Sequence, residues 1–472
     1  MGTRVHAFVD DALGRDDATG VAERIRSGEI SAAEAVEAAI ARIERVDPDL
    51  GAVQRDDFDR ARAEAKRREG RAPAGVFAGV PVALKDNLTT RGRPMTVGSD
   101  AVSDHPRSID GDYAKQLFAT GVVPVATSTM PPFGWTASTE RPGGRATRNP
   151  WDTERSAGGS SGGSAALVAA GAVPIAHGND GGGSIRIPAA ACGLVGLKPS
   201  RGRHLGDPRT DGLPVAIVSG GVLTRSVRDT AAMHAALEET YRNPKLQPIG
   251  EVKGAGARRL RIGFIIDSPV GPPTDASTRA VIESSADLLD SLGHHVEPYD
   301  PPAPRSFKTD FEDYWAFLAF MVHRTGPKRM GEGFDASRLD PLTLGLSSQA
   351  ARRLHRMPLV IARLRASGRA YDRSLGALDI VMSPVLAHTT PPIGYLGADL
   401  PFEVHLERLR AYACFTPLHN AAGAPAISLP LGQSPEQLPI GVMFAARRGA
   451  ERMLLELAYE LEEASPFARI EA

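Results

Sequence analysis

Apolar positions recur at helical spacing in the first part of the chain. In "ISAAEAVEAAIARIERV" Ser31 stands three residues before Glu34, the pattern of a capping box, and the apolar positions that follow are Val36, Ala39, Ile40 and Ile43. This spacing predicts an amphipathic helix. Residues 55–70 are rich in charge and predict a second, mostly solvated helix that ends at Gly70.

Further along, short apolar runs separated by glycine and proline replace the helical spacing. The runs "GVVPVAT" (121–127) and "AVPIAHG" (172–178) predict buried strands between helices. "LRIGFIID", a helix over residues 275–292 and "HHVEPYD" predict a strand-helix-strand unit, and "LDIVMSPV" predicts another buried strand. Mixed α/β is therefore the expected class. No Gly-x-Gly-x-x-Gly opens the 275–292 helix, so we interpret this unit as scaffold and not as a dinucleotide site.

The densest aromatic segment of the chain is "FEDYWAFLAFMVHR", in which the aromatic residues are Phe311, Tyr314, Trp315, Phe317 and Phe320. It is typical of a core-packing helix, and the alternative is an aromatic wall or lid over a substrate. The basic stretch over residues 352–370 is interrupted by Pro358 and is interpreted as a surface helix, not as a membrane anchor.

Composition narrows the class of protein. Of the 472 residues 42% are hydrophobic and 24% charged, and the net charge of -1 offers no electrostatic case for nucleic acid. Length favours two domains, but no linker or internal repeat supports a division. The two cysteines, Cys192 and Cys414, make no disulfide framework and no metal-site spacing, so we expect a reducing cytoplasm. The longest apolar stretch, Ala165–Ala176, is too short to span a bilayer.

Two glycine-rich loops with serines lie in "GGSSGGSAALVAAGAVPIAHGNDGGGSIRIPAA", residues 158–190. Consecutive glycines let several N–H groups point into one concavity, which suits an anion. The lysine of a phosphate-binding loop is missing, which favours the transient oxyanion of acyl transfer. Gly-x-Ser-x-Gly occurs around Ser160, but the polar residues before it do not read as the strand that an α/β-hydrolase requires. The match to Gly-x-Ser-x-Gly nevertheless leaves one alternative, an esterase-type serine hydrolase that uses Ser160 and a histidine.

Together with "GVPVALKDNL" and "TRNPW" upstream and "FTPLHNAAGAPAISLPLGQSPEQLPIGVMF" downstream, these loops resemble the signature of the amidase signature family of serine hydrolases. The resemblance implies one amidase domain over residues 1–472, with a mixed central sheet flanked by helices on both sides. Within it we expect an N-terminal helical segment (1–70), a signature core (71–230) and a helical substrate-side segment (305–370). The family activity is hydrolysis of linear amides to an acid and ammonia or an amine, without a metal or organic cofactor.

The resemblance also assigns the catalytic residues. It implies that Ser184 is the nucleophile, that Ser160, held after a cis peptide bond, bridges the proton transfer, and that Lys85 is the base. A lysine with a pKa near ~10.4 is neutral in about a thousandth of molecules at neutral pH. Lowering that pKa by ~3 units requires disfavouring the ammonium by about 4 kcal/mol, which burial can supply. Lys85 within an apolar run fits this demand.

Further residues are expected to support this relay. Gly181, Gly182 and Gly183 would supply backbone donors to the oxyanion, a device worth several kcal/mol. We expect Asp180 and Arg186 to brace the turn around the nucleophile, and Ser161 to support Ser160 by hydrogen bonding. His177, in an apolar strand, is interpreted as a core histidine, and Cys192 as buried packing.

The substrate loop departs from the family pattern. "ATSTMPPFGW" (126–135) replaces "GKTNxPEF", which predicts a more apolar site. We expect the substrate to contact Met130, Phe133, Trp135, Tyr314 and Trp315. The amidotransferase A subunit, which acts on glutamyl-tRNA and feeds ammonia to a partner, usually has "TNMDEF" and "GSIRQPA". This chain has "TSTMPPF" and "GSIRIPA", which favours a free-standing amidase like those of bacteria, especially actinobacteria.

The expected partner is therefore a small-molecule amide, with no nucleic acid and no membrane, and the family makes a homodimer a reasonable expectation. A non-enzymatic anion-binding protein is a further alternative. The presence of all three catalytic residue types at the family spacing argues against it.

Overall fold

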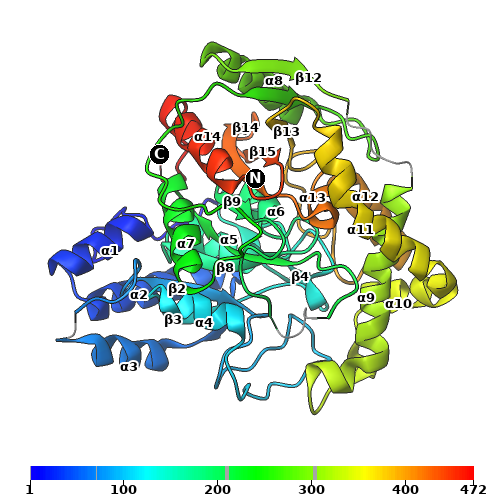
Figure 1. Cartoon of the computed structure of the whole chain (residues 1–472). Helices are drawn as coiled ribbons and strands as arrows, with labels where there is room; N and C mark the ends of the chain where they lie inside the picture. Colours follow the sequence, from blue (N-terminus) through cyan, green and yellow to red (C-terminus); the bar gives the residue numbers. More distant parts are fainter. Residues whose placement is uncertain (1, 71, 208–211, 301–305, 472) are drawn as a thin grey trace.

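The central element is a mixed β-sheet of eleven strands (Figure 1). The computed structural model describes residues 2–70, 72–207, 212–300 and 306–471. In order across the sheet the strands are β1 (Val53–Asp56), β3 (Val123–Ser128), β2 (Pro81–Lys85), β8 (Ile175–Asp180), β10 (Ser219–Thr224), β9 (Val195–Lys198), β14 (Ala426–Gln433), β15 (Pro439–Ala446), β13 (Ile380–Pro384), β11 (Arg261–Phe264) and β12 (His295–Pro298). β2 is parallel to β3 and β8, whereas β8 is antiparallel to β10.

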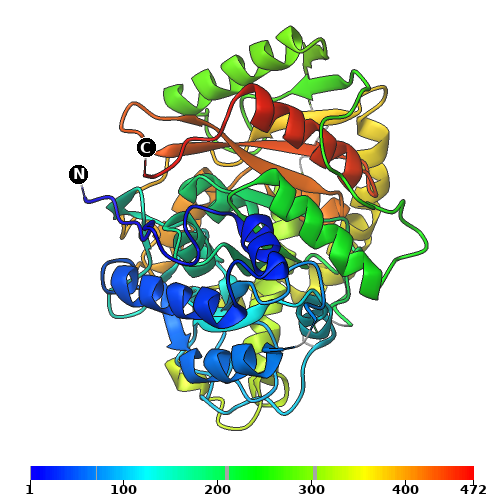
Figure 2. The same cartoon turned by 90° about the vertical axis from the view of Figure 1, so that its left-hand side faces the viewer.

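Helices lie on both sides of this sheet, as Figures 1 and 2 show, which confirms the predicted α/β class. In the first half of the chain they are α1 (Ala18–Ser27), α2 (Ala32–Leu50), α3 (Phe58–Arg68), α4 (Asp112–Ala119), α5 (Gly162–Ala169), α6 (Arg186–Cys192) and α7 (Val227–Thr240). In the second half they are α8 (Ala276–Ser291), α9 (Phe307–Met330), α10 (Pro341–Arg353), α11 (Met357–Ser374), α12 (Phe402–Tyr412), α13 (Pro417–Ala422) and α14 (Glu451–Ala464). No helix in the described part of the chain is long and apolar enough to cross a bilayer.

Short elements complete the description. They are the 3-10 helices η1 (Pro132–Gly134), η2 (Ala336–Arg338) and η3 (Leu354–Arg356), and two small hairpins, β4 (Glu140–Arg141) with β5 (Arg145–Ala146) and β6 (Arg148–Asn149) with β7 (Asp152–Ser156). The β6–β7 hairpin leads directly into the first glycine-rich loop.

The strands predicted at 121–127 and 172–178 are β3 and β8. Nearly all of their residues are buried, because α2 and α3 contact β3 while α5 contacts β2 and β8. The parallel pairing of β2 with β8 sets Val82 opposite Ile175. Because parallel strands end at the same edge of a sheet, this register brings Lys85 and Asp180, the last residues of their strands, to one edge.

The N-terminal prediction is correct for the first helix and wrong at the start of the second. The Ser31 hydroxyl accepts a hydrogen bond from the Glu34 N–H, and the Glu34 carboxylate accepts one from the Ser31 N–H, so the capping box is present. Residues 53–56 form the edge strand β1, and α3 begins only at Phe58. Pairing of β1 with β3 supplies backbone hydrogen bonds that outweigh the helical charge pattern of this segment.

The helices α9, α10 and α11 form a layer beside the sheet, on the right in Figure 1. The aromatic segment over 311–320 lies inside α9. The basic stretch over 352–370 is interrupted, as the sequence predicted: α10 ends at Arg353, η3 follows, and Pro358 stands in the first turn of α11. Proline is tolerated there because its missing N–H has no partner within the helix in any case.

The strand-helix-strand unit predicted around residues 275–292 is confirmed as β11, α8 and β12. Asp275 caps α8 by accepting a hydrogen bond from the Thr278 N–H. The predicted strand "LDIVMSPV" is β13, which is parallel to β11. Side chains of this half of the sheet, Leu429 and Phe444 among them, form a buried cluster with α8 and α14.

Candidate active site

Lys85 ends β2 with its side chain inside the protein, where it is 1% exposed. Its Nζ lies 2.8 Å from Ser160 Oγ, 2.9 Å from Ser161 Oγ and 2.7 Å from Asn179 Oδ1. These three partners are uncharged oxygen atoms. Burial removes the hydration that stabilises an ammonium, a cost that a neutral amine does not bear.

Ser160 follows Gly159 through a cis peptide bond in the loop between β7 and α5. Other atoms lie so close to this loop that glycine is required at two positions, Gly159 in the loop itself and Gly134 in the neighbouring segment. A Cβ on Gly159 would lie 2.5 Å from the Ser138 carbonyl oxygen, and one on Gly134 would lie 2.9 Å from Ser160 Oγ. β7 does precede the serine, contrary to the sequence interpretation, but it pairs with β6 in a separate hairpin and not with the central sheet.

Ser184 lies in the turn between β8 and α6 and lines the same cavity as Ser160. Its hydroxyl makes no hydrogen bond to another described residue, whereas its carbonyl oxygen accepts one from Ser161 Oγ at 2.5 Å. Contrary to the expectation from the sequence, Ser161 makes no hydrogen bond to Ser160. It connects the Lys85 amine to the backbone of Ser184, because its Oγ is within hydrogen-bond distance of both.

A buried ion pair holds the turn around Ser184. Asp180 and Arg186 are both fully buried, and Arg186 donates from Nη2 and Nε to the two carboxylate oxygens, each at 2.9 Å. Burial alone would raise the pKa of Asp180, but the Arg186 guanidinium outweighs it and holds that pKa well below its usual value. The sequence predicted this brace, and the structure brings the two residues together.

The same carboxylate takes one of the three expected oxyanion donors. The Gly183 N–H donates to Asp180 Oδ1 at 2.8 Å and is therefore directed into the turn. The N–H groups of Gly181, Gly182 and Ser184 make no hydrogen bond to other described residues, and all three residues line the cavity. The donors available to an oxyanion thus differ from the predicted set in one member, with Ser184 in place of Gly183.

Two residues from the C-terminal part of the chain complete the brace and were missed by the sequence analysis. Asn420 in α13 donates to the carbonyl oxygens of Asp180 and Ile217, each at 3.0 Å, and accepts from Arg186 Nη2 at 2.7 Å. Thr416 donates to the Gly182 carbonyl oxygen at 2.5 Å. Both lie in the quoted segment "FTPLHNAAG", but nothing in its spacing indicates contact with the nucleophile turn.

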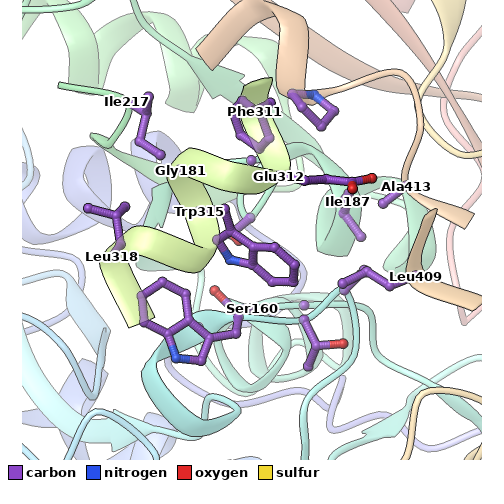
Figure 3. A pocket seen from close by; sticks show the side chains of 18 of the residues that line it. Ser160, Gly181, Ile187, Ile217, Phe311, Glu312, Trp315, Leu318, Leu409 and Ala413 are labelled. Carbon is purple, nitrogen blue, oxygen red and sulfur yellow. The ribbon is translucent and has the colours of Figure 1, made fainter. Parts of the chain in front are cut away.

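The cavity beside the two serines has a volume of about 210 Å³ and is mostly apolar. Figure 3 shows Ser160 and Gly181 together with Phe311, Trp315 and Leu318, which come from one face of α9. Besides these it is lined chiefly by Phe133, Trp135, Ile187, Ile217, Phe307, Leu406 and Leu409. The aromatic segment therefore serves both as packing and as a cavity wall.

Three of the five predicted substrate-contacting residues, Phe133, Trp135 and Trp315, line this cavity. Met130 and Tyr314 do not, and these two predictions are corrected. Tyr314 lies on another face of α9, where its hydroxyl bonds to the N–H and carbonyl of Val215. Met130 is buried behind the loop that carries Phe133.

His177 lies next to Lys85 but not in the cavity. Its Nδ1 accepts a hydrogen bond from the Lys85 backbone N–H at 3.4 Å, and its ring packs on Tyr113. It therefore supports the strand pairing as a core residue. Among the described residues no group of three His, Cys, Asp or Glu side chains could hold a metal ion.

Known proteins resemble this chain in sequence and in fold. The family model described as "Amidase" matches residues 34–455. The chain is similar to "Putative amidase AmiC" of Mycobacterium tuberculosis, with 49% identity over 100% of this chain and 99% of that one. Its structure is similar to that of 6-aminohexanoate cyclic dimer hydrolase (TM-score 0.86, 33% identity, 98% and 99% coverage). It is also similar to a bacterial aryl acylamidase of the amidase signature family (TM-score 0.83, 27% identity, 96% of each chain).

The Asp180–Arg186 pair predicts a pH-dependent stability. Because the pKa of Asp180 is lower in the folded chain, its contribution is present above the unfolded value of 3.8 and is lost as the pH falls. We expect Asp180→Asn to lower the free energy of unfolding at pH 7 by about 3–5 kcal/mol, since Arg186 stays buried without its partner. Below about pH 4 the difference from wild type should shrink.

Urea denaturation at pH 7 and at about pH 2.5, below the unfolded pKa of 3.8, measures this effect. Asp59→Asn, which removes an exposed carboxylate, is the matched control and should change stability by less than about 0.5 kcal/mol. Equal stability of wild type and Asp180→Asn at pH 7 would show that the brace does not hold the turn.

Proposed function

The chain belongs to the amidase signature family and hydrolyses an amide C–N bond, and we propose that Ser184 is its nucleophile, with Ser160 and Lys85 carrying the proton. The observation that supports this assignment is the contact of Lys85 Nζ with Ser160 Oγ at 2.8 Å beside a cavity that Ser184 also lines. The products are a carboxylic acid and ammonia or an amine.

In this mechanism the neutral Lys85 amine accepts the proton of Ser160, and Ser160 accepts the proton of Ser184 as Ser184 Oγ attacks the carbonyl carbon. The tetrahedral intermediate then collapses. The proton returns through Ser160 to the leaving nitrogen, the C–N bond breaks, and an acyl-enzyme on Ser184 remains. Water adds to the acyl carbon, gives its proton to the same relay, and releases the acid and free Ser184.

The oxyanion that forms during both steps needs donors that are already in place. The N–H groups of Gly181, Gly182 and Ser184 are candidates, since the Asp180 carboxylate accepts those of Gly183, Ile185 and Arg186 but none of these three. Loss of one such donor typically costs about 2.7–4 kcal/mol in the barrier. Asp180, Arg186 and Asn420 act here as positioning residues, because they hold the backbone that carries these donors.

The two other enzyme hypotheses have less support. An esterase that uses Ser160 with a histidine would need an imidazole beside Ser160, but the basic group there is Lys85, and His177 bonds to the Lys85 backbone. An amidotransferase subunit is disfavoured by the similarity to a relative named as an amidase that spans the whole chain. A free-standing amidase remains the conclusion.

We propose further that the cavity binds the acyl part of the substrate and that this part is apolar, with an aromatic ring as the best fit. About 150 Å³ is enough to hold benzene in an engineered cavity, so about 210 Å³ accommodates an aryl ring with a short linker. Trp135 and Trp315 pack edge to face, with their ring centroids 6.4 Å apart, and both line the wall of the cavity. Such a wall favours planar apolar groups over short aliphatic ones.

The remaining expectations from the sequence stand as proposals. We treat residues 1–472 as one amidase domain, and we propose a cytoplasmic location in which Cys192 and Cys414 stay as free thiols. The expected assembly is a homodimer. No cofactor enters the proposed reaction.

The catalytic assignment predicts the effect of three substitutions. Ser184→Ala, Ser160→Ala and Lys85→Met should each lower kcat for amide hydrolysis by about 10⁴-fold or more, because the relay acts as one unit. Ammonia release measures the loss, and Ser27→Ala on the exposed end of α1 is the control. Full activity in Ser184→Ala, with acyl transfer to Ser160, would contradict the assignment.

The acyl pocket predicts a change in substrate preference. Trp315→Ala should lower kcat/KM for aryl amides by about 10- to 100-fold and change that for acetamide far less, since only large acyl groups reach the wall. A panel of aliphatic and aryl amides gives the ratio. Phe320→Ala, on the same helix but outside the cavity, should leave the ratio unchanged; an equal effect of both substitutions would refute the pocket.

A further inference from the structure

Asn179 lies next to the relay, at the end of β8, and its carboxamide oxygen accepts two hydrogen bonds. One comes from Lys85 Nζ at 2.7 Å and the other from Asn87 Nδ2 at 2.9 Å. Asn179 also lines the cavity, one residue before Asp180. The side chain is thus held from one direction by Asn87 and faces the amine from the other.

Counting donors and acceptors around the amine gives the direction of each hydrogen bond. A neutral amine has two N–H donors and one lone pair. The Asn179 carboxamide oxygen is an acceptor only, so Lys85 must donate to it. Ser161 has a single proton, which it gives to the Ser184 carbonyl oxygen at 2.5 Å, so Ser161 must accept from Lys85 as well.

With both N–H groups engaged, the position that remains on the nitrogen is the lone pair. The third partner of Nζ is Ser160 Oγ at 2.8 Å. We propose that Asn179, together with Ser161, is a positioning residue that fixes the two N–H groups of neutral Lys85 and thereby directs its lone pair at Ser160. This inference rests on the proposed relay and adds the group that sets its direction.

The test compares an uncharged acceptor, a charged acceptor and no acceptor at position 179. Asn179→Asp keeps the shape and the acceptor but places a carboxylate against Nζ, which favours the ammonium. The acid limb of the kcat/KM–pH profile should move to higher pH by about one to three units, with most of the wild-type rate recovered on the alkaline side.

Two variants complete the design. Asn179→Ser supplies an uncharged oxygen and should keep the wild-type midpoint with a modest loss of rate, which maintains the test if Asn179→Asp does not fold. Asn179→Leu removes the acceptor and should lower kcat at every pH, with little change in KM. Asn243→Asp makes the same charge change at a distant loop, where Asn243 bonds to the Gly202 carbonyl, and should leave the profile unchanged.

An unshifted midpoint in folded Asn179→Asp, or no activity in it at any pH, would overturn the inference. If Ser184→Ala and Lys85→Met are inactive in the same assay, the relay stands and only the role of Asn179 fails. If Ser184→Ala is active, the relay itself fails.

A second inference rests on a different observation, an ion pair in the wall of the cavity. Glu312 on α9 and Arg410 on α12 both line the cavity, and Arg410 donates from Nε and Nη2 to the two Glu312 oxygens at 2.8 and 2.6 Å. In Figure 3 Glu312 is separated from Ser160 by Trp315. The pair joins two helices that both contribute apolar side chains to the cavity lining.

Glu312 is the more buried partner of the pair: its side chain is 14% exposed, and that of Arg410 is 36% exposed. Each charge neutralises the other, so the cavity offers no net charge at this point to a substrate. We infer that the Glu312–Arg410 pair closes the distal end of the acyl cavity and sets the longest acyl group that the enzyme accepts. This inference rests on the proposed function, since it needs the amidase activity and the acyl group in this cavity, but it does not need the relay.

A double-mutant cycle over a series of straight-chain acyl amides tests it. Glu312→Ala and Arg410→Ala should each raise kcat/KM for long acyl groups relative to short ones by about tenfold, and the double variant should do no more than either single one, since both open the same pair. Hydrolysis of acetamide serves as the internal control and should change little.

Additive effects of the two substitutions, or an effect of Arg410→Ala alone, would overturn the closure and identify Arg410 as a direct ligand of the substrate. An unchanged length profile in all variants would show that the pair lies outside the path of the acyl chain.

Discussion

In the proposed mechanism the amine of Lys85 has to act as a base, and the rest of the site depends on how a lysine is kept inside the protein. Its Nζ lies among three uncharged oxygens, those of Ser160, Ser161 and Asn179. Burial removes the hydration that stabilises an ammonium, and uncharged acceptors return only part of it. The proposed relay requires the neutral amine, and in our proposal the same contacts direct its lone pair.

A second constraint fixes the nucleophile relative to this base. The Asp180 carboxylate accepts hydrogen bonds from the Arg186 side chain and from the N–H of Gly183. Asn420 and Thr416 donate to the backbone carbonyl oxygens of Asp180 and Gly182. A buried ion pair by itself is weak evidence for stability. Here it also has a geometric effect, because it takes up the Gly183 N–H, whereas the N–H groups of Gly182 and Ser184, which line the cavity, make no hydrogen bond to other described residues.

Much of this site could be predicted from the sequence because its catalytic residues lie in recognisable motifs. Lys85 and the turn that carries Ser184 lie at one edge of the sheet because β2 and β8 are parallel and end together, and the loop between β7 and α5 brings Ser160 to Lys85. The partners that bring these groups into register could not be predicted in the same way. Asn420 lies in a motif more than two hundred residues away from the turn that it holds, and no spacing rule connects the two.

The errors have physical causes as well. Tyr314 and Trp315 are adjacent in sequence, and helical periodicity alone does not fix which of them faces the cavity, because this depends on how α9 is rotated against its neighbours. The charged residues before Phe58 suit a helix, but pairing with the edge of β3 makes them a strand. Tertiary hydrogen bonds decided both cases.

The charge on Lys85 tests the account most directly. Protein labelled with ¹³C and ¹⁵N in lysine allows Nζ of Lys85 to be followed by NMR across the pH range in which activity rises, with Lys85→Met used to assign its signal. The account predicts that this nitrogen loses its proton over the same pH range in which kcat/KM increases, well below the range of the exposed lysines. A Lys85 that remains an ammonium throughout the active pH range would contradict it.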